Sequence, residues 1–171
     1  MRTRNSLLLR PRQILVAASA GGHWVQIRRL RSAWVDLNVC YLTTSRGYRD
    51  EIEEENSNND DCKIHYIAVD DANINEKHRL ITQFIQILST IIWIRPSVVI
   101  STGASVGYFA LMVGKILGAK TIWVDSIANS DTISLSGQKV QPFSDLFITQ
   151  WSHLEQVKPG GRDIVYAGAV I

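Results

Sequence analysis

Short apolar segments alternate with segments of helical periodicity along nearly all of this chain of 171 residues. Strands that alternate with helices form βαβ units, whose crossovers are right-handed and whose sheet is parallel and covered on both faces. The rhythm predicts an α/β fold, a Rossmann-like doubly wound parallel sheet in one domain at residues 13–171, after a basic arm at residues 1–12. The predicted strands are Gln13–Ala18, Asn38–Thr43, Ile64–Val69, Ser97–Ser101, Thr121–Val124, Leu146–Thr149 and Ile164–Ala167.

Helices are predicted between these strands. They cover residues 24–35 and 46–55, a long segment that begins within 73–77 and continues to 94, a segment that ends at 117, and residues 133–140. The long helix is the most apolar of them. Such a helix is either deeply buried or partly covered by something outside the chain. Its predicted apolar stripe consists of Leu80, Ile81, Phe84, Ile85, Leu88, Ile91 and Ile92, and Ile87 and Trp93 broaden it.

Composition and charge restrict the class of protein. With 46% apolar and 20% charged residues the chain is an ordinary globular protein, and no run of about 18 apolar residues is present to span a membrane. The net charge is only +2, but most arginines lie within the first 31 residues and seven acids lie between Asp50 and Asp61. This asymmetry favours a basic face that meets phosphate or an anionic membrane, with solvated faces that have no partner as the alternative. No nucleic-acid partner is expected. Cys40 and Cys62 form neither a disulfide framework nor a CxxC site, so a reduced, cytoplasmic setting is expected.

Two glycine-containing turns follow the first and fourth predicted strands. They are Ser19-Ala20-Gly21-Gly22-His23 and Ser101-Thr102-Gly103-Ala104-Ser105, and a predicted helix follows each. Unpaired N–H groups at a helix N-terminus bind anions, most often phosphate. Because parallel strands end at one edge of the sheet, both turns are expected to open into one ligand crevice. A tight turn without a ligand is the alternative for the first of them.

Neither turn has a nucleotide fingerprint. Gly21-Gly22 lacks the G-x-G-x-x-G spacing, and Thr43-Thr44 stand where an acidic residue would follow the second strand. The chain also contains no G-K-[ST] motif. A nicotinamide enzyme and a P-loop protein are therefore not expected, and no cofactor is predicted.

Three polar residues at the expected crevice are candidates for chemistry. His23 is a candidate general base or phosphate donor, with a surface histidine at a helix start as the alternative. Asp125, after the fifth strand, is either a ligand contact or a helix cap, and the same two possibilities hold for Ser105. The other histidines fit no zinc spacing, so no metal is expected; they are His65, His78 and His153.

The motifs together resemble a known family. S-A-G-G-H and S-T-G-A-S-V-G-Y resemble the two glycine loops of the lipid II-forming GlcNAc transferase. The stretch Thr121–Trp151, with S-L-S-G inside it, and the closing V-Y-A-G-A-V are similar to the acceptor-side subunit of bipartite lipid-linked glycosyltransferases. One branch of that family completes dolichyl-diphosphate chitobiose in eukaryotes, and another builds bacterial exopolysaccharides. The resemblance covers the chain from Gln13 onward.

The resemblance implies the amino-terminal half of an inverting GT-B glycosyltransferase. It would add a sugar from a UDP-sugar donor (GlcNAc, glucuronic acid or another hexose) to a polyprenyl-diphosphate sugar, and would be active only with a separate donor-binding α/β subunit. His23, or alternatively Asp125, would take the acceptor proton. The acceptor diphosphate would bind at Ser19, Gly21, Gly22, Thr102, Gly103 and Ser105. The protein would lie on the inner face of the cytoplasmic membrane through Arg2, Arg4, Arg28, Arg29 and Arg31.

Two other functions remain open from the sequence. One is a non-catalytic scaffold that recruits a transferase to the membrane, which would tolerate loss of His23 and Asp125 while the complex still assembles. The other is a stand-alone hydrolase or nucleotide-binding protein of the same fold, which would hold a nucleotide when purified as a single chain.

Overall fold

The computed structural model describes residues 13–57, 63–72, 76–157 and 162–169. Seven strands form one parallel sheet in the order β3-β2-β1-β4-β5-β6-β7. The predicted α/β class with a parallel sheet is confirmed, and no strand boundary differs from its predicted position by more than one residue. The strands are β1 (Gln13–Ala18), β2 (Asn38–Thr43), β3 (Ile64–Ala68), β4 (Val98–Ser101), β5 (Lys120–Val124), β6 (Leu146–Thr149) and β7 (Ile164–Tyr166).

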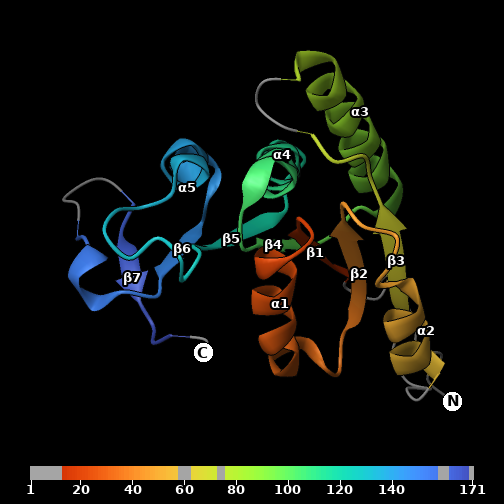
Figure 1. Ribbon diagram of the computed structural model, residues 1–171, viewed down its shortest axis with the longest axis horizontal. Coiled ribbons are helices and arrows are strands. Elements are labelled where there is room, and N and C mark those ends of the chain that lie inside the picture. The colour runs from red at the N-terminus through yellow and green to blue at the C-terminus, as the bar shows by residue number, and fades with distance from the viewer. Residues whose placement is uncertain (1–12, 58–62, 73–75, 158–161, 170–171) are drawn as a thin grey trace, which may run out of the picture.

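Helices cover both faces of the sheet (Figure 1). On one face lie α1 (Gly22–Arg29) and α2 (Arg49–Ser57), and on the other lie α3 (Lys77–Ile94), α4 (Ala104–Ile116) and α5 (Leu135–Val140). Two clusters of buried apolar side chains fill the space between helices and sheet, one on each face. The interior is therefore three-layered, as the strand–helix alternation predicts.

The helix predicted over residues 24–35 is divided in two. Regular α1 ends at Arg29, and a 3-10 turn, η1 (Arg31–Trp34), follows it. The tighter turn brings the buried Trp34 indole to the Tyr41 hydroxyl, to which its N–H donates at 2.9 Å. Two further 3-10 turns, η2 (Gln141–Phe143) and η3 (Ser152–Leu154), flank β6.

The apolar stripe predicted on α3 coincides only in part with its buried face, which includes Ile87 and Ile91 of that stripe. The buried residues of the helix are Gln83, Ile87, Ile91 and Ile94. Of the predicted stripe, Ile81, Ile85 and Ile92 are at least half exposed, and Trp93 beside them is 71% exposed. Because α3 is apolar on most sides, periodicity alone does not identify the face that packs on α4 and the sheet.

The sheet has its topological switch point between β1 and β4. Ala17 of β1 pairs with Leu42 of β2 on one side and with Ser101 of β4 on the other. The connections that leave β1 and β4 diverge to opposite faces of the sheet, and ligands of doubly wound folds bind in the crevice that this creates. Both glycine turns follow these two strands, so the topology brings them to one place.

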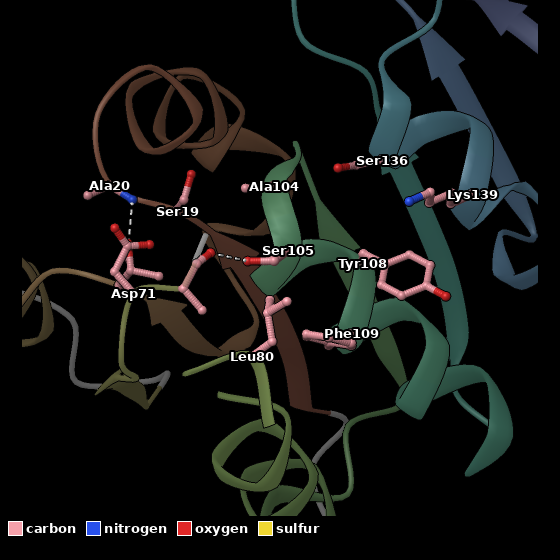
Figure 2. Close-up of a pocket in the computed structure, with 12 residues that line it drawn as sticks. Ser19, Ala20, Asp71, Leu80, Ala104, Ser105, Tyr108, Phe109, Ser136 and Lys139 are labelled. Carbon is pink, nitrogen blue, oxygen red and sulfur yellow. Dashed lines mark hydrogen bonds between the residues drawn. The ribbon is translucent and has the colours of Figure 1, made fainter. Parts of the chain in front are cut away.

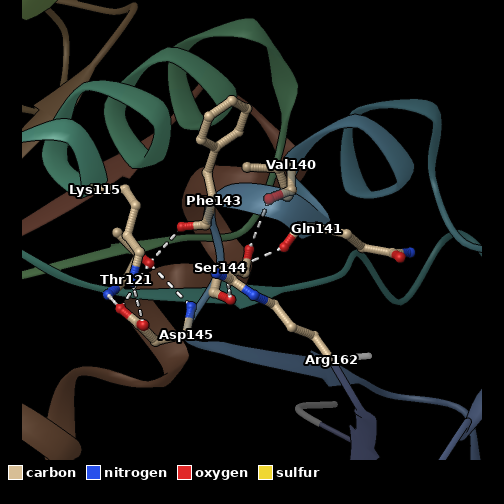
Figure 3. A network of polar contacts seen from close by, with 8 residues as sticks. All are labelled: Lys115, Thr121, Val140, Gln141, Phe143, Ser144, Asp145 and Arg162. Carbon is tan, nitrogen blue, oxygen red and sulfur yellow. Dashed lines mark hydrogen bonds and ion pairs between the residues drawn. The ribbon is translucent and has the colours of Figure 1, made fainter. Parts of the chain in front are cut away.

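A polar network fixes the β5–β6 part of the sheet (Figure 3). The Lys115 ammonium on α4 forms an ion pair with Asp145, whose second carboxylate oxygen accepts a hydrogen bond from the Thr121 N–H at 3.0 Å. The Arg162 guanidinium, just before β7, donates to the Ser144 carbonyl. These contacts hold the start of β6 against β5, and with it the α5 segment that borders the site described next.

Candidate functional site

The two glycine turns are in direct contact. The Thr102 hydroxyl donates to the His23 carbonyl at 2.9 Å. Gly103 packs so closely on the His23 ring that a Cβ there would lie 2.1 Å from Cε1, and Gly103 has a φ of +149°. Both the contact and the backbone angle require glycine at this position. The predicted meeting of the two turns at one edge of the sheet is therefore present, with the His23 imidazole between them.

Part of the backbone of the first turn is already hydrogen-bonded. The Ala20 N–H donates to the Thr44 hydroxyl at 3.0 Å, and the Gly21 N–H donates to the Tyr48 hydroxyl at 3.1 Å. The N–H groups of Gly22 and His23 begin α1 and receive no partner from the described part of the chain. Any anion bound by this turn would therefore contact Gly22 and His23 rather than the N–H groups before them.

The His23 side chain is half-buried, and its Nδ1 atom has no hydrogen-bond partner among the described residues. Burial lowers the pKa of His23 below its ordinary value, while the Thr102 backbone and the Asp125 carboxylate act in the opposite direction. Burial disfavours the charged imidazolium. The side chain is consequently neutral near neutral pH and able to accept a proton.

The structure corrects the expectation that Asp125 offers its carboxylate to the crevice. Asp125 is only 2% exposed. Its carboxylate accepts hydrogen bonds from the Trp123 indole N–H at 3.0 Å, the Ser134 N–H at 3.0 Å and the Ser134 hydroxyl at 2.5 Å. Its main-chain carbonyl accepts further bonds from Gln26 and Gln150. Asp125 therefore anchors the segment before α5 from below the surface.

Arg28 also differs from the prediction, because its side chain is not open to a membrane. Arg28 is 8% exposed and forms ion pairs with Glu51, at 3.2 Å, and with Glu55. Its guanidinium lies 4.9 Å from the centre of the Tyr41 ring. The ion pairs of Arg28 join α1 to α2. Burial lowers the pKa of Arg28, but the two paired carboxylates outweigh burial and raise it.

The remaining predicted arginines divide into two groups. Arg29 and Arg31 are exposed at the C-terminal end of α1, on the face of the sheet opposite α3 (Figure 1). Arg2 and Arg4, with the rest of the predicted basic arm, lie outside the described residues.

Ser105 does not cap α4. The N-cap position is Gly103, and the Ser105 hydroxyl instead donates to the Ala72 carbonyl at 3.2 Å. Ala104, between them, has a φ of +61°, an unfavourable angle for a residue with a Cβ. Strained backbone of this kind concentrates at ligand sites. The second turn thus links α4 to the segment that follows β3.

A cavity of about 560 Å³ opens beside the two turns (Figure 2). It combines apolar surface with hydroxyl groups and two charged side chains, as ligand pockets commonly do. Several of its residues are absent from the sequence prediction, although Asp71 follows β3 at the same edge of the sheet and could have been found by the same rule. The cavity is lined by Ser19, Ala20, Thr44, Asp71, Ala72, Leu80, Ala104, Ser105, Tyr108, Phe109, Ser136 and Lys139.

No three histidine, cysteine or acidic side chains within the described ranges are grouped closely enough to hold a metal ion. None of the described helices has the length and apolarity needed to cross a membrane.

A parallel sheet with paired glycine turns at its switch point defines a Rossmann-like domain. MurG from Acinetobacter baumannii superposes with a TM-score of 0.67 at 13% identity, covering 93% of this chain and 46% of that one. UDP-N-acetylglucosamine 2-epimerase from Rickettsia bellii gives a TM-score of 0.60 at 11% identity, covering 84% and 40%. This chain thus spans less than half of either structure, and the likeness concerns the fold alone.

Comparison of the sequence with known families identifies the family of this chain. Residues 14–169 match the family described as oligosaccharide biosynthesis protein Alg14 like, and the chain belongs to that family. The UDP-N-acetylglucosamine transferase subunit ALG14 of Eremothecium gossypii is 24% identical over 169 residues, covering 85% of this chain and 75% of that protein. The Mus musculus protein of the same name is 35% identical over 85 residues, covering 46% and 37%. The predicted family is confirmed.

Proposed function

We propose that this chain is the acceptor-binding subunit of a two-chain inverting glycosyltransferase, which transfers a sugar from a UDP-sugar to a polyprenyl-diphosphate-linked sugar. The observation that carries the proposal is the contact of two glycine turns around His23 beside a cavity, in a member of an oligosaccharide-biosynthesis family. The names of the relatives, which are UDP-N-acetylglucosamine transferase subunits, favour N-acetylglucosamine as the donor sugar.

The acceptor diphosphate is proposed to bind where α1 and α4 begin. The unpaired N–H groups of Gly22 and His23 and the first turn of α4 supply hydrogen-bond donors, and the hydroxyls of Ser19 and Ser105 border the same cavity. The positive ends of both helix dipoles favour a diphosphate there. The dipoles of the backbone N–H groups at both helix starts stabilise the charge of the diphosphate.

His23 is the proposed general base. As the acceptor hydroxyl attacks the anomeric carbon, its proton passes to the neutral imidazole, a new carbon–oxygen bond forms, and the bond from the sugar to UDP breaks. The leaving UDP takes the electron pair of that bond and remains with the donor subunit. Asp125 is too buried to reach the acceptor, and its negative charge stabilises the His23 imidazolium formed in the reaction.

The donor site is proposed to lie on a separate α/β subunit. A GT-B active site is a cleft between two Rossmann-like domains, and the described residues form a single sheet. Both relatives are named as transferase subunits. The partner would close over the edge of the sheet where the two turns lie.

Membrane contact is proposed for the outer face of α3. Ile81, Ile85, Ile92 and Trp93 are exposed there, and the helix sequence contains no acidic residue. Basic residues at both ends, with Trp93 near one of them, suit the boundary between lipid headgroups and acyl chains on the cytoplasmic side. Arg29 and Arg31 lie at the end of α1, on the opposite face of the sheet (Figure 1). A flat membrane that contacts α3 would therefore not contact them.

A methyl group at Gly22 tests the diphosphate site. A Cβ at Gly22 meets no atom within 4 Å, so Gly22→Ala is expected to fold normally. In the complex with its donor subunit, however, the methyl group occupies the space that a diphosphate would approach, and the KM for a polyprenyl-diphosphate sugar should rise by about tenfold or more.

The control is Gly47→Ala, in an exposed turn where the nearest atom to an added Cβ is the Ser45 hydroxyl at 3.5 Å. An unchanged acceptor KM in Gly22→Ala, with both melting temperatures unchanged, would contradict diphosphate binding at the first turn.

A further inference from the structure

The cavity beside the turns changes from polar to apolar along α4 (Figure 2). Ser105, in the first turn of the helix, contributes a hydroxyl where the acceptor diphosphate is proposed to bind. Phe109 is four residues further on, so the two residues lie on the same face of the helix. Leu80 of α3 lines the cavity beside them. The cavity therefore offers an apolar wall, formed by Leu80 and Phe109, next to the diphosphate site.

Leu80 is an apolar side chain that lines the cavity rather than the core. It is half-buried, in the first turn of α3. Phe84 and Leu88, one and two turns further along the same helix, pack against the core cluster on this face of the sheet. Leu80 is not among the side chains that pack there in the described part of the chain. Contact with an apolar ligand would account for a leucine at this position.

Phe109 is held in place by aromatic neighbours. Its ring lies 5.4 Å from the Phe84 ring, at an interplanar angle of 67°, and 5.4 Å from the Tyr108 ring. Edge-to-face contacts of this kind are favourable for aromatic pairs. All three rings pack against the core cluster. The apolar wall is therefore formed before a ligand binds, which reduces the entropy that binding would remove.

The apolar wall continues onto the outside of α3. Ile81 directly follows Leu80 and is 61% exposed, and Ile85, one turn further on, is 54% exposed. Both belong to the outer face of α3, for which membrane contact is proposed above. Leu80 thus lies at the border between the cavity and that face. A flexible apolar chain that starts in the cavity can pass over Leu80 and remain in contact with apolar side chains.

We propose that Leu80 and Phe109 bind the isoprene units nearest the diphosphate, and that Leu80 directs the rest of the lipid chain to the outer face of α3. This inference rests on the proposed function, and it leaves the diphosphate where α1 and α4 begin. A ligand with an anionic head and a long apolar tail matches a cavity that has backbone N–H donors at one side and an apolar exit at another. The cavity should therefore prefer an isoprenoid diphosphate to the same diphosphate without a tail.

Two soluble diphosphates that differ only in their tails test the apolar wall. Methyl diphosphate has no isoprene unit, geranyl diphosphate has a short isoprenoid tail, and neither carries a sugar. Their dissociation constants are measured by calorimetry on the full chain. The wild-type protein should bind geranyl diphosphate about tenfold or more tightly, because apolar surface of the tail is buried. Leu80→Ser should reduce this preference to about threefold or less and leave binding of methyl diphosphate unchanged.

The matched control is Ile116→Ser, at the C-terminal end of α4, where the side chain is 70% exposed and does not line the cavity. Leu80→Met keeps an apolar side chain and should retain the preference for geranyl diphosphate. The three variants should melt close to the wild-type protein, because neither position packs in the core cluster. An undiminished preference in Leu80→Ser, or an equal reduction in Ile116→Ser, would overturn the role of Leu80.

A longer tail tests the path of the lipid. The tail of geranylgeranyl diphosphate should extend from the cavity onto the outer face of α3. Ile81→Ser should therefore weaken binding of this probe by about threefold or more and leave geranyl diphosphate unaffected. The same effect on both probes, or no effect on either, would overturn the path over Leu80.

Failure of the proposed function gives a different result. If the wild-type chain bound neither methyl nor geranyl diphosphate, the diphosphate site would be wrong, and this inference with it. If the wild-type chain bound both equally well, the diphosphate site would stand and only the apolar wall would be wrongly assigned. Gly22→Ala should weaken both probes alike, because its added methyl group meets the diphosphate that they share.

Discussion

At the scale of single residues, His23 contributes two groups to the proposed site: a backbone N–H at the start of α1 and the imidazole that is the proposed general base. Replacing His23 by alanine removes a half-buried side chain whose Nδ1 atom has no hydrogen-bond partner among the described residues, so the melting temperature should change little. Sugar transfer with the donor subunit present should fall by about 10²–10⁴-fold, as for loss of a general base. His78→Ala, at an exposed position on α3, is the matched control. Full activity in His23→Ala with an intact complex would instead favour the scaffold function.

The pH dependence of transfer gives a second test of His23. The base acts when it is neutral, and burial lowers its pKa below the ordinary value. The acid limb of kcat/KM, which reports the free protein, should therefore lie below the ordinary pKa of histidine, and kcat/KM should persist to lower pH than for an exposed imidazole. The unfolded chain binds the proton first as pH falls, so stability should also decrease below about pH 6.5. The pH dependence of transfer and the pH dependence of stability should both be smaller in His23→Gln than in the wild-type protein, measured between about pH 5 and 8.

Gly103 should matter through His23. A Cβ at Gly103 would lie 2.1 Å from the imidazole, so Gly103→Ala must displace the ring, and its φ adds strain of about 1–3 kcal/mol. Transfer should fall nearly as far as in His23→Ala. The double variant should be no slower than His23→Ala alone, because both changes remove the same group. If the rate losses of the two single variants multiplied in the double variant, Gly103 would contribute to transfer in another way, such as by a direct contact with the acceptor.

Some residues of the site could be found in the sequence and others could not. The two glycine turns contain His23, Gly22 and Gly103. Each turn directly follows a predicted strand, so the sequence pattern of a strand followed by glycine identifies these residues. Asp71 follows β3 and could have been found by the strand-end rule, whereas Lys139 reaches the cavity from α5, which only the tertiary structure brings there. For the same reason the sequence did not reveal that Glu51 and Glu55 neutralise Arg28, or that Asp125 is buried.

At the scale of elements, α3 shows the limit of periodicity most clearly. The sequence predicted a long apolar helix that ends before Pro96, and the helix ends at Ile94. It did not predict which face is buried, because apolar residues occur on most sides. Burial is decided by the contacts with α4 and the sheet, whose positions depend on the whole topology. The exposed remainder is the surface that we propose for the membrane.

A charge in the exposed face of α3 tests that surface. Ile85→Glu should leave the fold intact, since Ile85 is 54% exposed, and should lower cosedimentation with vesicles that contain anionic lipid. The expected loss is about 2 kcal/mol or more, from the lost apolar burial and the added repulsion. Ser32→Glu, at an exposed position on the other face of the sheet, should bind like the wild-type protein. Equal losses of vesicle binding in both variants would mean that the net charge of the protein, rather than the exposed face of α3, determines membrane binding.

At the scale of the whole molecule, the alternation of strands and helices was enough to predict the sheet. Right-handed crossovers leave few arrangements of seven parallel strands, and the observed one brings β1 beside β4. Activity is not determined at this scale, because a glycosyltransferase from Rickettsia africae and the epimerase from Rickettsia bellii share the fold. The family match and the site residues, rather than the sheet, therefore support the proposed transfer reaction.

The last prediction is that this chain does not transfer sugar on its own. The described residues provide one sheet and one crevice, and the proposed acceptor already occupies that crevice. A second sheet is needed to hold UDP and to stabilise its charge as it leaves. The purified chain should therefore show no transfer from UDP-N-acetylglucosamine to a polyprenyl-diphosphate sugar, although it should bind that acceptor. Addition of the donor subunit should restore transfer. Turnover by the chain without a partner, or a nucleotide bound tightly to it after purification, would contradict the two-chain enzyme.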